Sequence, residues 1–386
     1  MRRLIGITPE NLVFREKERI TNFIRSGYIS YFHIRKPSFS EQQMREYLSS
    51  FPKDVREKLS LHDFHSLAFE LGIGGIHINK RNPVLKEEYK KKRISVSCHS
   101  IEEVKEWKGK SEYVFLSPIF DSISKEGYKS KFSSEELKQY FKERVLDSKV
   151  VALGGITKEN IEELEQIGFS SCALLSSLWQ LPKTMFISPN KSSKEILEES
   201  KAVLQSGIRF IQLRMKQGTD EQIIKVARIL RSLCDKYNAI LTIDDRINLL
   251  ETNLFDGVHL GKNDMPLTQA KQITQNKYLL GATCNTIEDV KKAMESKADY
   301  LGIGPYRYTT TKQNLAPILG LKGYKEIITY FKKTKKHIPF YAIGGIETKD
   351  LQELKRIGVF GIALSGTISN ANNKEQTIKE IITEYV

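Results

Sequence analysis

The strongest constraint on the fold is that the chain contains the same series of short motifs twice. Six segments recur in the same order, and their separation grows slowly, from 180 residues between Ile7 and Ile187 to 190 residues between Val151 and Tyr341. Ordered self-similarity of this kind indicates two copies of one fold. The matching pairs are Ile7–Pro9 with Ile187–Pro189, Phe32–Arg35 with Ile211–Arg214, Gly75–Asn82 with Gly257–Asp264, Val96–Val104 with Ala282–Val290, Glu112–Pro118 with Asp299–Pro305, and Val151–Ile156 with Tyr341–Ile346.

Each copy alternates short β-type runs with longer amphipathic patterns. Apolar residues at spacings of three and four predict helices, for example over Asp220–Tyr237 and Thr286–Ser296. Eight βα units in about 200 residues predict an α/β fold with a closed (β/α)8 barrel, and an open doubly wound sheet is the alternative. The strands expected in the second copy are Met185–Ser188, Phe210–Leu213, Ile240–Ile243, Gly257–Leu260, Leu279–Ala282, Tyr300–Ile303, Phe340–Ile343 and Gly361–Leu364.

We therefore expect two tandem TIM barrels, over residues 1–180 and 184–386. A chain of 386 residues suits two domains, because single cores rarely grow beyond about 250–300 residues. The join at Trp179–Lys183 is too short to be a free tether, so we expect the barrels to touch. An intramolecular pseudo-dimer is one arrangement that would satisfy this expectation.

Composition places the chain among soluble globular proteins. The hydrophobic fraction is 40% and the charged fraction 28%, and no apolar run approaches the roughly 20 residues that span a bilayer. The segment Met1–Glu10 has the pattern of a first strand and not that of a signal peptide. The four cysteines are scattered without a CxxC pair, which predicts reduced thiols in a cytoplasmic protein.

The formal net charge of +14 raises the hypothesis of a nucleic-acid partner. Most lysines, however, alternate with glutamates along helical patterns, and the two dense basic runs, Lys90–Arg93 and Phe331–Lys336, lack an aromatic RNA-binding signature. We expect no nucleic-acid partner and no membrane partner. A modest basic field would favour small phosphorylated substrates.

Polar residues follow the second, third and fourth expected strands of the second copy. Arg214 and Lys216 are two residues apart and can both face an anion, while Asp244, Asp245 and Asp264 reach the same mouth. Two carboxylates on neighbouring loops opposite cationic side chains suit Mg2+ bound to a diphosphate, since this hard cation prefers oxygen ligands. The alternative is that these aspartates serve only as helix N-caps.

Hydroxyls and glycines follow the last three expected strands. The sixth is followed by Thr309, Thr310, Thr311 and Lys312, which could bind a phosphate or carboxylate. The seventh and eighth end in the small-residue motifs AIGGI and ALSGTI, where backbone N–H groups can approach a phosphate closely. The alternative for these glycines is a role in tight turns only.

Taken in order, QLRMK, IDDR, GVHLGKND, GIGPYRYTTTK, AIGGI and GIALSGTI resemble the pattern of thiamine phosphate synthases over essentially all of the second copy. The resemblance implies a transferase that joins aminomethylpyrimidine diphosphate to a thiazole phosphate. It also implies a dissociative reaction, in which Mg2+-assisted loss of diphosphate leaves a cation that the thiazole nitrogen attacks. Stabilisation of the leaving group would then be the main catalytic contribution.

The resemblance assigns a role to each matching position. It implies that Asp245 and Asp264 bind Mg2+. The implied catalytic residues are Arg214, Lys216, Thr283 and Lys312. The implied substrate-binding residues are Gln212, Arg214, Lys216 and Lys312 for the diphosphate, Asp244 and Thr283 beside it, Thr309, Thr310 and Thr311 for the thiazole, and Gly344, Gly345, Ser365 and Gly366 for its phosphate.

Three positions depart from the family pattern. The family usually has asparagine at Asp244, serine at Thr283 and serine at Gly366. The first change could add negative charge beside the metal, and the second keeps a hydroxyl. The third leaves backbone contacts in place. None of them removes a metal ligand or a diphosphate-binding cation, so we expect activity.

The first copy resembles the TenI-like relatives of the synthase, some of which are thiazole tautomerases. Arg35 and Asp63 persist, but Pro37 and Asn82 replace a lysine and a metal carboxylate. A histidine that the tautomerases use after the sixth strand is absent from Pro118–Phe120. Other matching positions are Ser97, Ser122–Ser124, Lys125, Gly154, Gly155, Leu175 and Ser176.

Five of the seven histidines lie in the first copy: His33, His62, His65, His77 and His99. His33 and His62 fall at expected strand ends and could do acid–base work. His77 matches His259 and is interpreted as a shared structural residue. The first copy is thus either a tautomerase or another thiazole-related enzyme, or a degenerate barrel that binds a ligand or serves in packing.

Two other functions remain open for the whole chain. One is a different phosphate-binding TIM-barrel isomerase, and the other is a non-catalytic sensor of thiamine precursors. The retention of Arg214, Asp245, Asp264 and Lys312 favours the enzyme.

Overall fold

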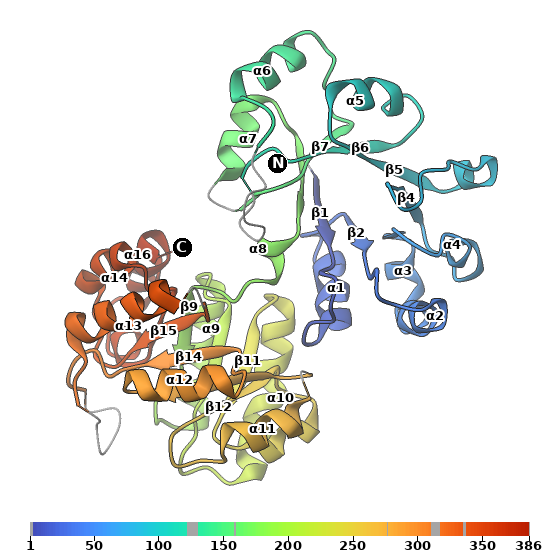
Figure 1. The fold of residues 1–386 in the computed structure, drawn as a ribbon. Coiled ribbons are helices and arrows are strands. Elements are labelled where there is room, and N and C mark those ends of the chain that lie inside the picture. Colours follow the sequence, from blue (N-terminus) through green and yellow to red (C-terminus); the bar gives the residue numbers. More distant parts are fainter. Residues whose placement is uncertain are drawn as a thin grey trace. The chain divides into compact units, whose positions relative to one another are not determined.

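The computed structural model describes residues 3–121, 130–157, 160–275, 277–309, 317–334 and 337–385. The chain divides into two compact units, Met1–Gln180 and Leu181–Val386. Each unit contains one closed, all-parallel barrel of eight strands, so the prediction of two tandem (β/α)8 barrels is confirmed (Figure 1).

In the first barrel, β1 closes the ring by pairing with both β2 and β8. Its strands are β1 (Arg3–Ile7), β2 (Tyr31–Ile34), β3 (Leu59–Leu61), β4 (Gly75–Ile78), β5 (Arg93–Cys98), β6 (Tyr113–Leu116), β7 (Val150–Ala152) and β8 (Ser171–Leu174). Its helices are α1 (Glu16–Arg25), α2 (Glu41–Ser49), α3 (Lys53–Arg56), α4 (Leu67–Glu70), the 3-10 helix η1 (Glu87–Lys91), α5 (Ile101–Trp107), α6 (Ser134–Lys142), α7 (Ile161–Ile167) and α8 (Ser176–Trp179).

In the second barrel, β9 pairs with β10 and β16. The strands are β9 (Thr184–Ile187), β10 (Phe210–Leu213), β11 (Ile240–Asp244), β12 (Gly257–Leu260), β13 (Leu279–Cys284), β14 (Tyr300–Ile303), β15 (Phe340–Ile343) and β16 (Gly361–Leu364). The helices are α9 (Ser193–Gln205), α10 (Asp220–Lys236), η3 (Ile247–Thr252), α11 (Leu267–Thr274), α12 (Ile287–Glu295), α13 (Gly320–Thr334), η4 (Thr348–Asp350), α14 (Leu351–Ile357), α15 (Gly366–Ser369) and α16 (Lys374–Tyr385).

The expected strands of the second barrel are present within two residues at each end. The largest difference is at β13, which continues to Cys284, because Thr283 and Cys284 still pair with β14. Strands buried on both sides read as short apolar runs between helical patterns, so their positions are visible in the sequence.

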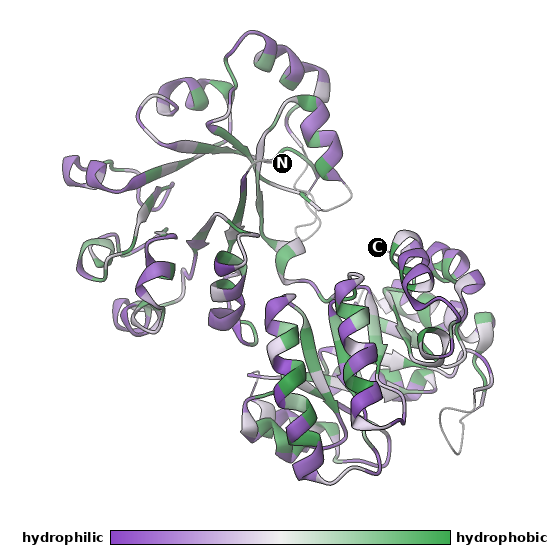
Figure 2. Cartoon of the chain, turned by 180° about the vertical axis from the view of Figure 1, so that it is seen from behind, coloured by the Kyte–Doolittle hydropathy of each residue, from purple (hydrophilic) through white to green (hydrophobic). Residues whose placement is uncertain are grey.

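The core of each unit lies between the strands and the surrounding helices. Helix α10 shows how the sequence produces this layer: Thr219 caps its N-terminus by accepting a hydrogen bond from the backbone N–H of Gln222, and its apolar face packs on the barrel. Figure 2 shows the resulting two-sided helices around largely hydrophobic strands. All four cysteines are buried as free thiols.

Within the described part of the chain, no helix has both the length and the apolar character needed to cross a bilayer.

Candidate functional site

The second barrel brings the sequence-predicted polar residues to the carboxyl ends of its strands. Gln212 lies on β10, Asp244 ends β11, and Thr283 lies near the end of β13. The loop after β12 carries Asp264. Because β10 to β13 are consecutive neighbours in the closed barrel, these side chains line one continuous side of its mouth.

Asp244 lies at the centre of the group that was predicted to hold diphosphate. Its Oδ1 accepts a hydrogen bond of 2.8 Å from Gln212 Nε2. Its Oδ2 lies 3.0 Å from Lys216 Nζ and 3.5 Å from Arg214 Nε. One carboxylate therefore orients all three side chains, and the two cations offset the negative charge that an aspartate adds here.

Asp245 and Asp264 form a pair of contacting carboxyl groups. Asp245 adopts a left-handed backbone conformation with φ of 64°, and Asp264 Oδ2 accepts a hydrogen bond of 2.6 Å from the Gly261 N–H. Burial and the hydrogen bond with Asp245 raise the pKa of Asp264. Burial alone would raise the pKa of Asp245, but hydrogen bonds with Asp264 and Lys216 outweigh it and lower that pKa.

Two carboxylates repel each other unless a proton or a cation lies between them. This pair therefore fits a hard divalent cation such as Mg2+, which prefers carboxylate oxygens. A small hollow beside the pair is lined by Met215, Lys216, Ile223, Asp244, Asp245 and Arg246.

Thr283 is held by the histidine on the neighbouring strand. His259 Nε2 lies 3.0 Å from Thr283 Oγ1. In the first barrel, His77 Nε2 lies 2.8 Å from Ser97 Oγ at the matching positions. The fold therefore places this histidine and this hydroxyl in the same contact in both barrels.

The glycines after β15 have conformations that other residues rarely adopt. Gly344 and Gly345 have φ of 89° and 69°, and a Cβ on Gly345 would lie 2.8 Å from the carbonyl oxygen of Tyr308. Next to them, after β16, the buried Oγ of Ser365 has no hydrogen-bond partner among the described residues. Close backbone packing beside an unsatisfied buried hydroxyl fits a ligand with several acceptor oxygens, as a phosphate has.

The glycine loops and the acidic group lie on opposite sides of the mouth. In the ring of eight strands, β15 is four strands away from β11, and β16 is four strands away from β12. The mouth therefore has two separate polar groups with space between them for two ligands. Thr309 lies in the described loop after β14, whereas Thr310, Thr311 and Lys312 lie outside the described residues.

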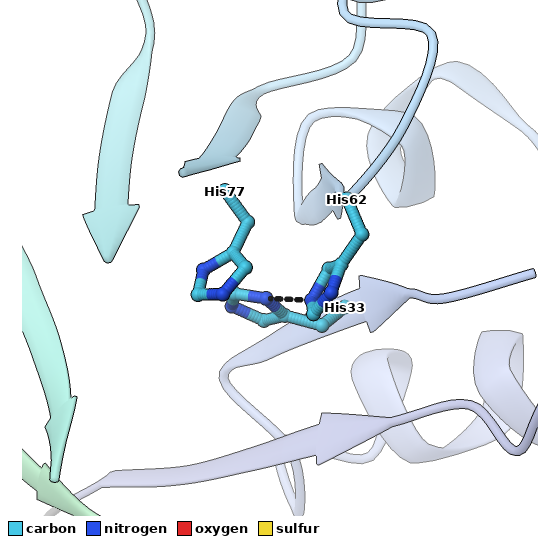
Figure 3. A group of neighbouring side chains, drawn as sticks. All are labelled: His33, His62 and His77. Atoms are coloured by element: carbon cyan, nitrogen blue, oxygen red, sulfur yellow. Dashed lines mark hydrogen bonds between the residues drawn. The ribbon is translucent and has the colours of Figure 1, made fainter. Parts of the chain in front are cut away.

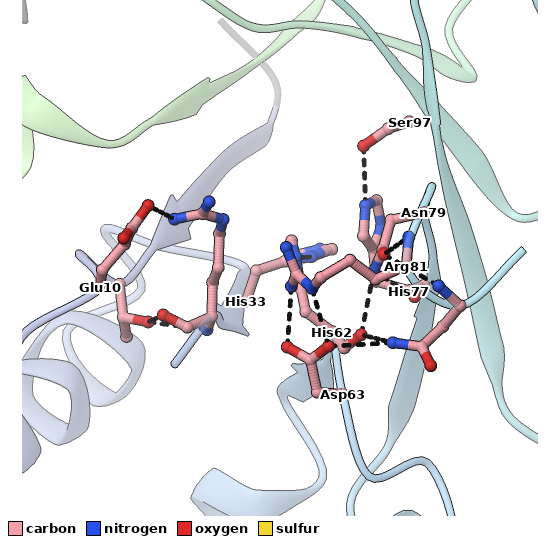
Figure 4. Close-up of polar contacts among 11 residues, drawn as sticks. Glu10, His33, His62, Asp63, His77, Asn79, Arg81 and Ser97 are labelled. Carbon is pink, nitrogen blue, oxygen red and sulfur yellow. Dashed lines mark hydrogen bonds and ion pairs between the residues drawn. The ribbon is translucent and has the colours of Figure 1, made fainter. Parts of the chain in front are cut away.

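The first barrel has a different network at the matching acidic positions (Figure 4). Arg81 donates hydrogen bonds from Nε and Nη2 to the two oxygens of Asp63, at 3.1 and 2.8 Å. Asn82 Nδ2 donates another to Asp63 Oδ1 at 2.9 Å. Arg35 pairs with Glu10 at 2.7 Å. Asp63 therefore contacts a guanidinium and an amide, where Asp245 of the second barrel contacts a carboxyl group and Lys216.

The glycine loop keeps its geometry in the first barrel. Gly154 and Gly155 have φ of 100° and 66°, close to the matching pair in the second barrel. Leu175 and Ser176 follow β8 in the places of Ser365 and Gly366. This loop therefore lacks the serine hydroxyl at the first of these positions.

Three histidines of the first barrel meet inside it, at the ends of adjacent strands. His33 Nδ1 lies 3.0 Å from His62 Nε2, and His33 Nε2 lies 2.8 Å from the hydroxyl of Tyr113. His77 stacks on His62, with ring centroids 4.1 Å apart. Burial lowers the pKa of all three, to about 3 for His77, so the imidazoles are neutral near pH 7.

Sequence reasoning missed Arg81 and Lys36. Arg81 stands in the motif NKRN where the second copy has GKND, and the replacement of Asn263 by an arginine was the available signal. Lys36 is fully buried, and its Nζ lies 2.8 Å from Glu16 Oε2. It therefore does not replace Lys216, although it is adjacent to Pro37.

The fold and the mouth residues define a tandem (β/α)8-barrel protein with polar groups suited to phosphorylated ligands. The family described as thiamine monophosphate synthase matches residues 4–178 and again residues 184–368. The chain therefore belongs to this family, which is a family of transferases, and contains two of its domains.

Similar proteins carry the corresponding names. A thiamine-phosphate synthase of Bacteroides fragilis is 44% identical over 197 residues, which are 51% of this chain and 97% of the relative. A thiamine-phosphate synthase of Flavobacterium johnsoniae is 38% identical over 199 residues, which are 52% of this chain and 94% of the relative. Among solved structures, thiamine phosphate pyrophosphorylase from Pyrococcus furiosus covers 53% of this chain and 95% of its own, at 29% identity and a TM-score of 0.47.

Proposed function

We propose that the second barrel is a thiamine phosphate synthase, joining aminomethylpyrimidine diphosphate to thiazole phosphate with release of diphosphate. The observation that carries this proposal is the arrangement around Asp244, where Gln212, Arg214 and Lys216 converge beside the carboxyl pair of Asp245 and Asp264. The names of the relatives agree with it.

Each group would have a distinct part in the reaction. Asp245 and Asp264 would hold Mg2+, which when bound supplies positive charge to the departing diphosphate. Arg214 and Lys216 would move away from Asp244 and bind the diphosphate oxygens. Gln212 would keep its hydrogen bond to the Asp244 carboxylate, which orients its side chain. Lys312 and the hydroxyls of Thr309, Thr310 and Thr311 would complete the site from the loop after β14.

The thiazole phosphate would bind on the opposite side of the mouth. Gly344, Gly345 and Gly366 would offer backbone N–H groups, and Ser365 Oγ would donate the hydrogen bond that it does not make to the protein. Thr283, held by His259, would line the space between the two ligands. Attack by a ring nitrogen needs no general base, so positioning and charge stabilisation would supply the catalysis.

The test is the formation of thiamine phosphate by the full chain with both substrates and Mg2+. Asp264→Asn is expected to lower turnover at least 100-fold, because a charged metal ligand is lost. The control Asp63→Asn, at the first-barrel position that matches Asp245, is expected to leave turnover unchanged. Equal loss in both variants, or no product from the folded wild type, would refute the assignment.

For the first barrel we propose a phosphate-ligand site that has lost the synthase reaction. The pairing of Asp63 with Arg81 supports this, because a guanidinium already neutralises the remaining carboxylate. Thiazole tautomerisation and simple ligand binding are the two alternatives. Exchange of thiazole-phosphate protons in D2O, measured with the Asp264→Asn chain, separates them: exchange supports a tautomerase, and binding without exchange supports the non-catalytic barrel.

A further inference from the structure

The first barrel contains a cluster of three imidazoles that the proposed function does not use. His33 lies on β2, His62 directly follows β3, and His77 lies on β4 (Figure 3). One ring nitrogen from each lies within 4.8 Å of the others. Among the described residues, no other group of three histidine, cysteine or acidic side chains has this spacing.

We propose that this cluster, named here the three-histidine site, binds a divalent transition-metal ion of the zinc type through His33, His62 and His77. Zinc–nitrogen bonds of about 2.0–2.1 Å in a tetrahedron place the ligand nitrogens roughly 3.4 Å apart. One pair of nitrogens in the cluster, His33 Nδ1 and His62 Nε2, is already at 3.0 Å. Small ring rotations would therefore bring the three nitrogens around one ion, which would replace this hydrogen bond.

Groups around the cluster are placed to orient the rings. If His33 binds through Nδ1, its Nε2–H can donate to the Tyr113 hydroxyl, 2.8 Å away. His77 has Ser95 Oγ 3.0 Å from Nδ1 and Ser97 Oγ 2.8 Å from Nε2, so either nitrogen can bind while the other keeps a partner. Metal-ligating histidines almost always have such a partner on the second nitrogen.

Hydrogen bonds from two asparagine side chains fix the backbone at His62. Asn79 Nδ2 and Asn82 Nδ2 each donate a hydrogen bond of 2.9 Å to the His62 carbonyl oxygen. Asn82 thus replaces a metal carboxylate of the second barrel and fixes a ligand-bearing loop in the first. A rigid support of this kind lowers the ordering cost of binding.

Protonation and charge are compatible with a cation. Histidine binds metals in its neutral form, and burial keeps these three imidazoles neutral. Two of the arginines near the cluster, Arg35 and Arg81, are ion-paired with Glu10 and Asp63. The third, Arg93, donates to the carbonyl oxygens of Glu57 and Leu59 and lies over the ring of Tyr31. Three protein ligands leave the ion a further coordination position for water or another ligand.

The second barrel supplies a natural comparison. Its matching positions carry Gln212, Asp244 and His259, so only one of the three imidazoles is present. Gln212 and Asp244 make the same close contact that His33 and His62 make. The three-histidine site therefore arises from two substitutions at a pair of positions that the fold already holds in contact.

The experiment is equilibrium binding of Zn2+ to the full chain in a large excess of Mg2+, which keeps Asp245 and Asp264 from competing. We expect one Zn2+ per chain. We expect His33→Gln and His77→Gln each to weaken Zn2+ binding at least 100-fold; the first of these introduces the residue found in the second barrel. Tyr113→Phe is expected to weaken Zn2+ binding about tenfold. His259→Gln, the match of His77 in the second barrel, is expected to leave the affinity for Zn2+ unchanged.

Co2+ gives an independent readout that needs no variant. A site with three nitrogen ligands and low coordination number gives strong visible absorption, whereas Co2+ bound by carboxylates and water absorbs weakly. Strong absorption in the wild type that His33→Gln removes supports the proposal. Absence of Zn2+ binding in the wild type, or equal binding in wild type, His33→Gln and His77→Gln, overturns it. Fluorescence of Trp107 and Trp179, both in the first barrel, verifies that each variant is folded.

Discussion

Arg81 binds Asp63 through two parallel hydrogen bonds, at 3.1 and 2.8 Å, in the first barrel. Asp63 matches Asp245, which contacts the carboxyl group of Asp264 in the second barrel. One copy of the fold thus places a fixed guanidinium where the other has a carboxylate pair suited to a metal ion. A bidentate guanidinium is always charged, so it removes the need for a cation there.

Restoring the acidic pair in the first barrel is expected to create a second Mg2+ site. In the Arg81→Asn/Asn82→Asp variant, both positions carry the residues of the second barrel, and Asp63 loses its guanidinium partner. Mg2+ titration by calorimetry should rise from one site per chain to two. If the variant folds and still binds a single Mg2+, the carboxylate pair is not sufficient for the site.

Asp244→Asn is expected to keep turnover within about threefold of the wild type. The amide can still accept the hydrogen bond from Gln212, while its lower charge releases Arg214 and Lys216 for diphosphate. Asp244→Ala should raise the KM for the pyrimidine diphosphate roughly tenfold, since hydrogen bonds to a charged group of about 1.5 kcal/mol are lost. Steady-state kinetics with the exposed Glu221→Gln as control checks this, and equal KM values for the two Asp244 variants would contradict it.

Gly345→Ala should raise the KM for thiazole phosphate about tenfold or more. Its φ of 69° and a contact of 2.8 Å between the new Cβ and Tyr308 O would strain the loop, at a cost of about 1–3 kcal/mol. Gly155→Ala strains the matching loop of the first barrel at least as much, because its φ is 66° and the new Cβ would clash with the carbonyl oxygen of Asp121. This variant should leave synthase kinetics unchanged. If Gly345→Ala, Gly155→Ala and the wild type all have the same KM for thiazole phosphate, the loop after β15 does not hold the phosphate.

Lys36→Met is expected to destabilise the first barrel by about 3–5 kcal/mol, because it leaves the buried carboxylate of Glu16 without its cation. Lys36 Nζ also donates to the carbonyls of Pro9 and Asn11, at 2.8 and 2.9 Å. Urea unfolding followed by fluorescence of Trp107 and Trp179 measures this barrel alone. Glu16→Gln/Lys36→Met should recover much of the loss, and a double variant as unstable as the single one would argue against the charge as the cause.

The first barrel is expected to lose stability as the pH falls below 6.5. The folded-state pKa of His77 is about 3, against 6.5 in the unfolded chain, so the unfolded state binds the proton first. Stability from this group is complete above pH 6.5 and falls between pH 6.5 and about 3. One such histidine accounts for about 1.5 kcal/mol between pH 6.5 and about pH 5. Tryptophan-monitored unfolding should show a shallower pH slope for His77→Gln, and an unchanged slope would exclude His77 as a source.

Much of the candidate site was readable from the sequence because barrel geometry maps strand ends onto one mouth. QLRMK and IDDR stand directly after apolar runs, so the placement of Arg214, Lys216 and Asp245 followed from the strand positions. The contacts between them did not follow. Side-chain direction in a loop depends on packing. Comparison of the motifs shows that Arg81 and Asn82 replace Asn263 and Asp264, but it does not show which of these side chains contacts Asp63 or Asp245.

The sequence by itself determined the repeat, the eight βα units of each copy and the order of their polar motifs, because hydrophobic periodicity is local along the chain. Only the tertiary structure decided which groups touch. His33 and His62 are 29 residues apart in sequence, and their ring nitrogens are 3.0 Å apart in space. The Asp63–Arg81 and Asp245–Asp264 pairs join matching loops of the two barrels, but Arg81 stands one position before the residue that matches Asp264. Barrel closure brings distant strand ends together, and packing then fixes the side-chain directions that the sequence pattern leaves open.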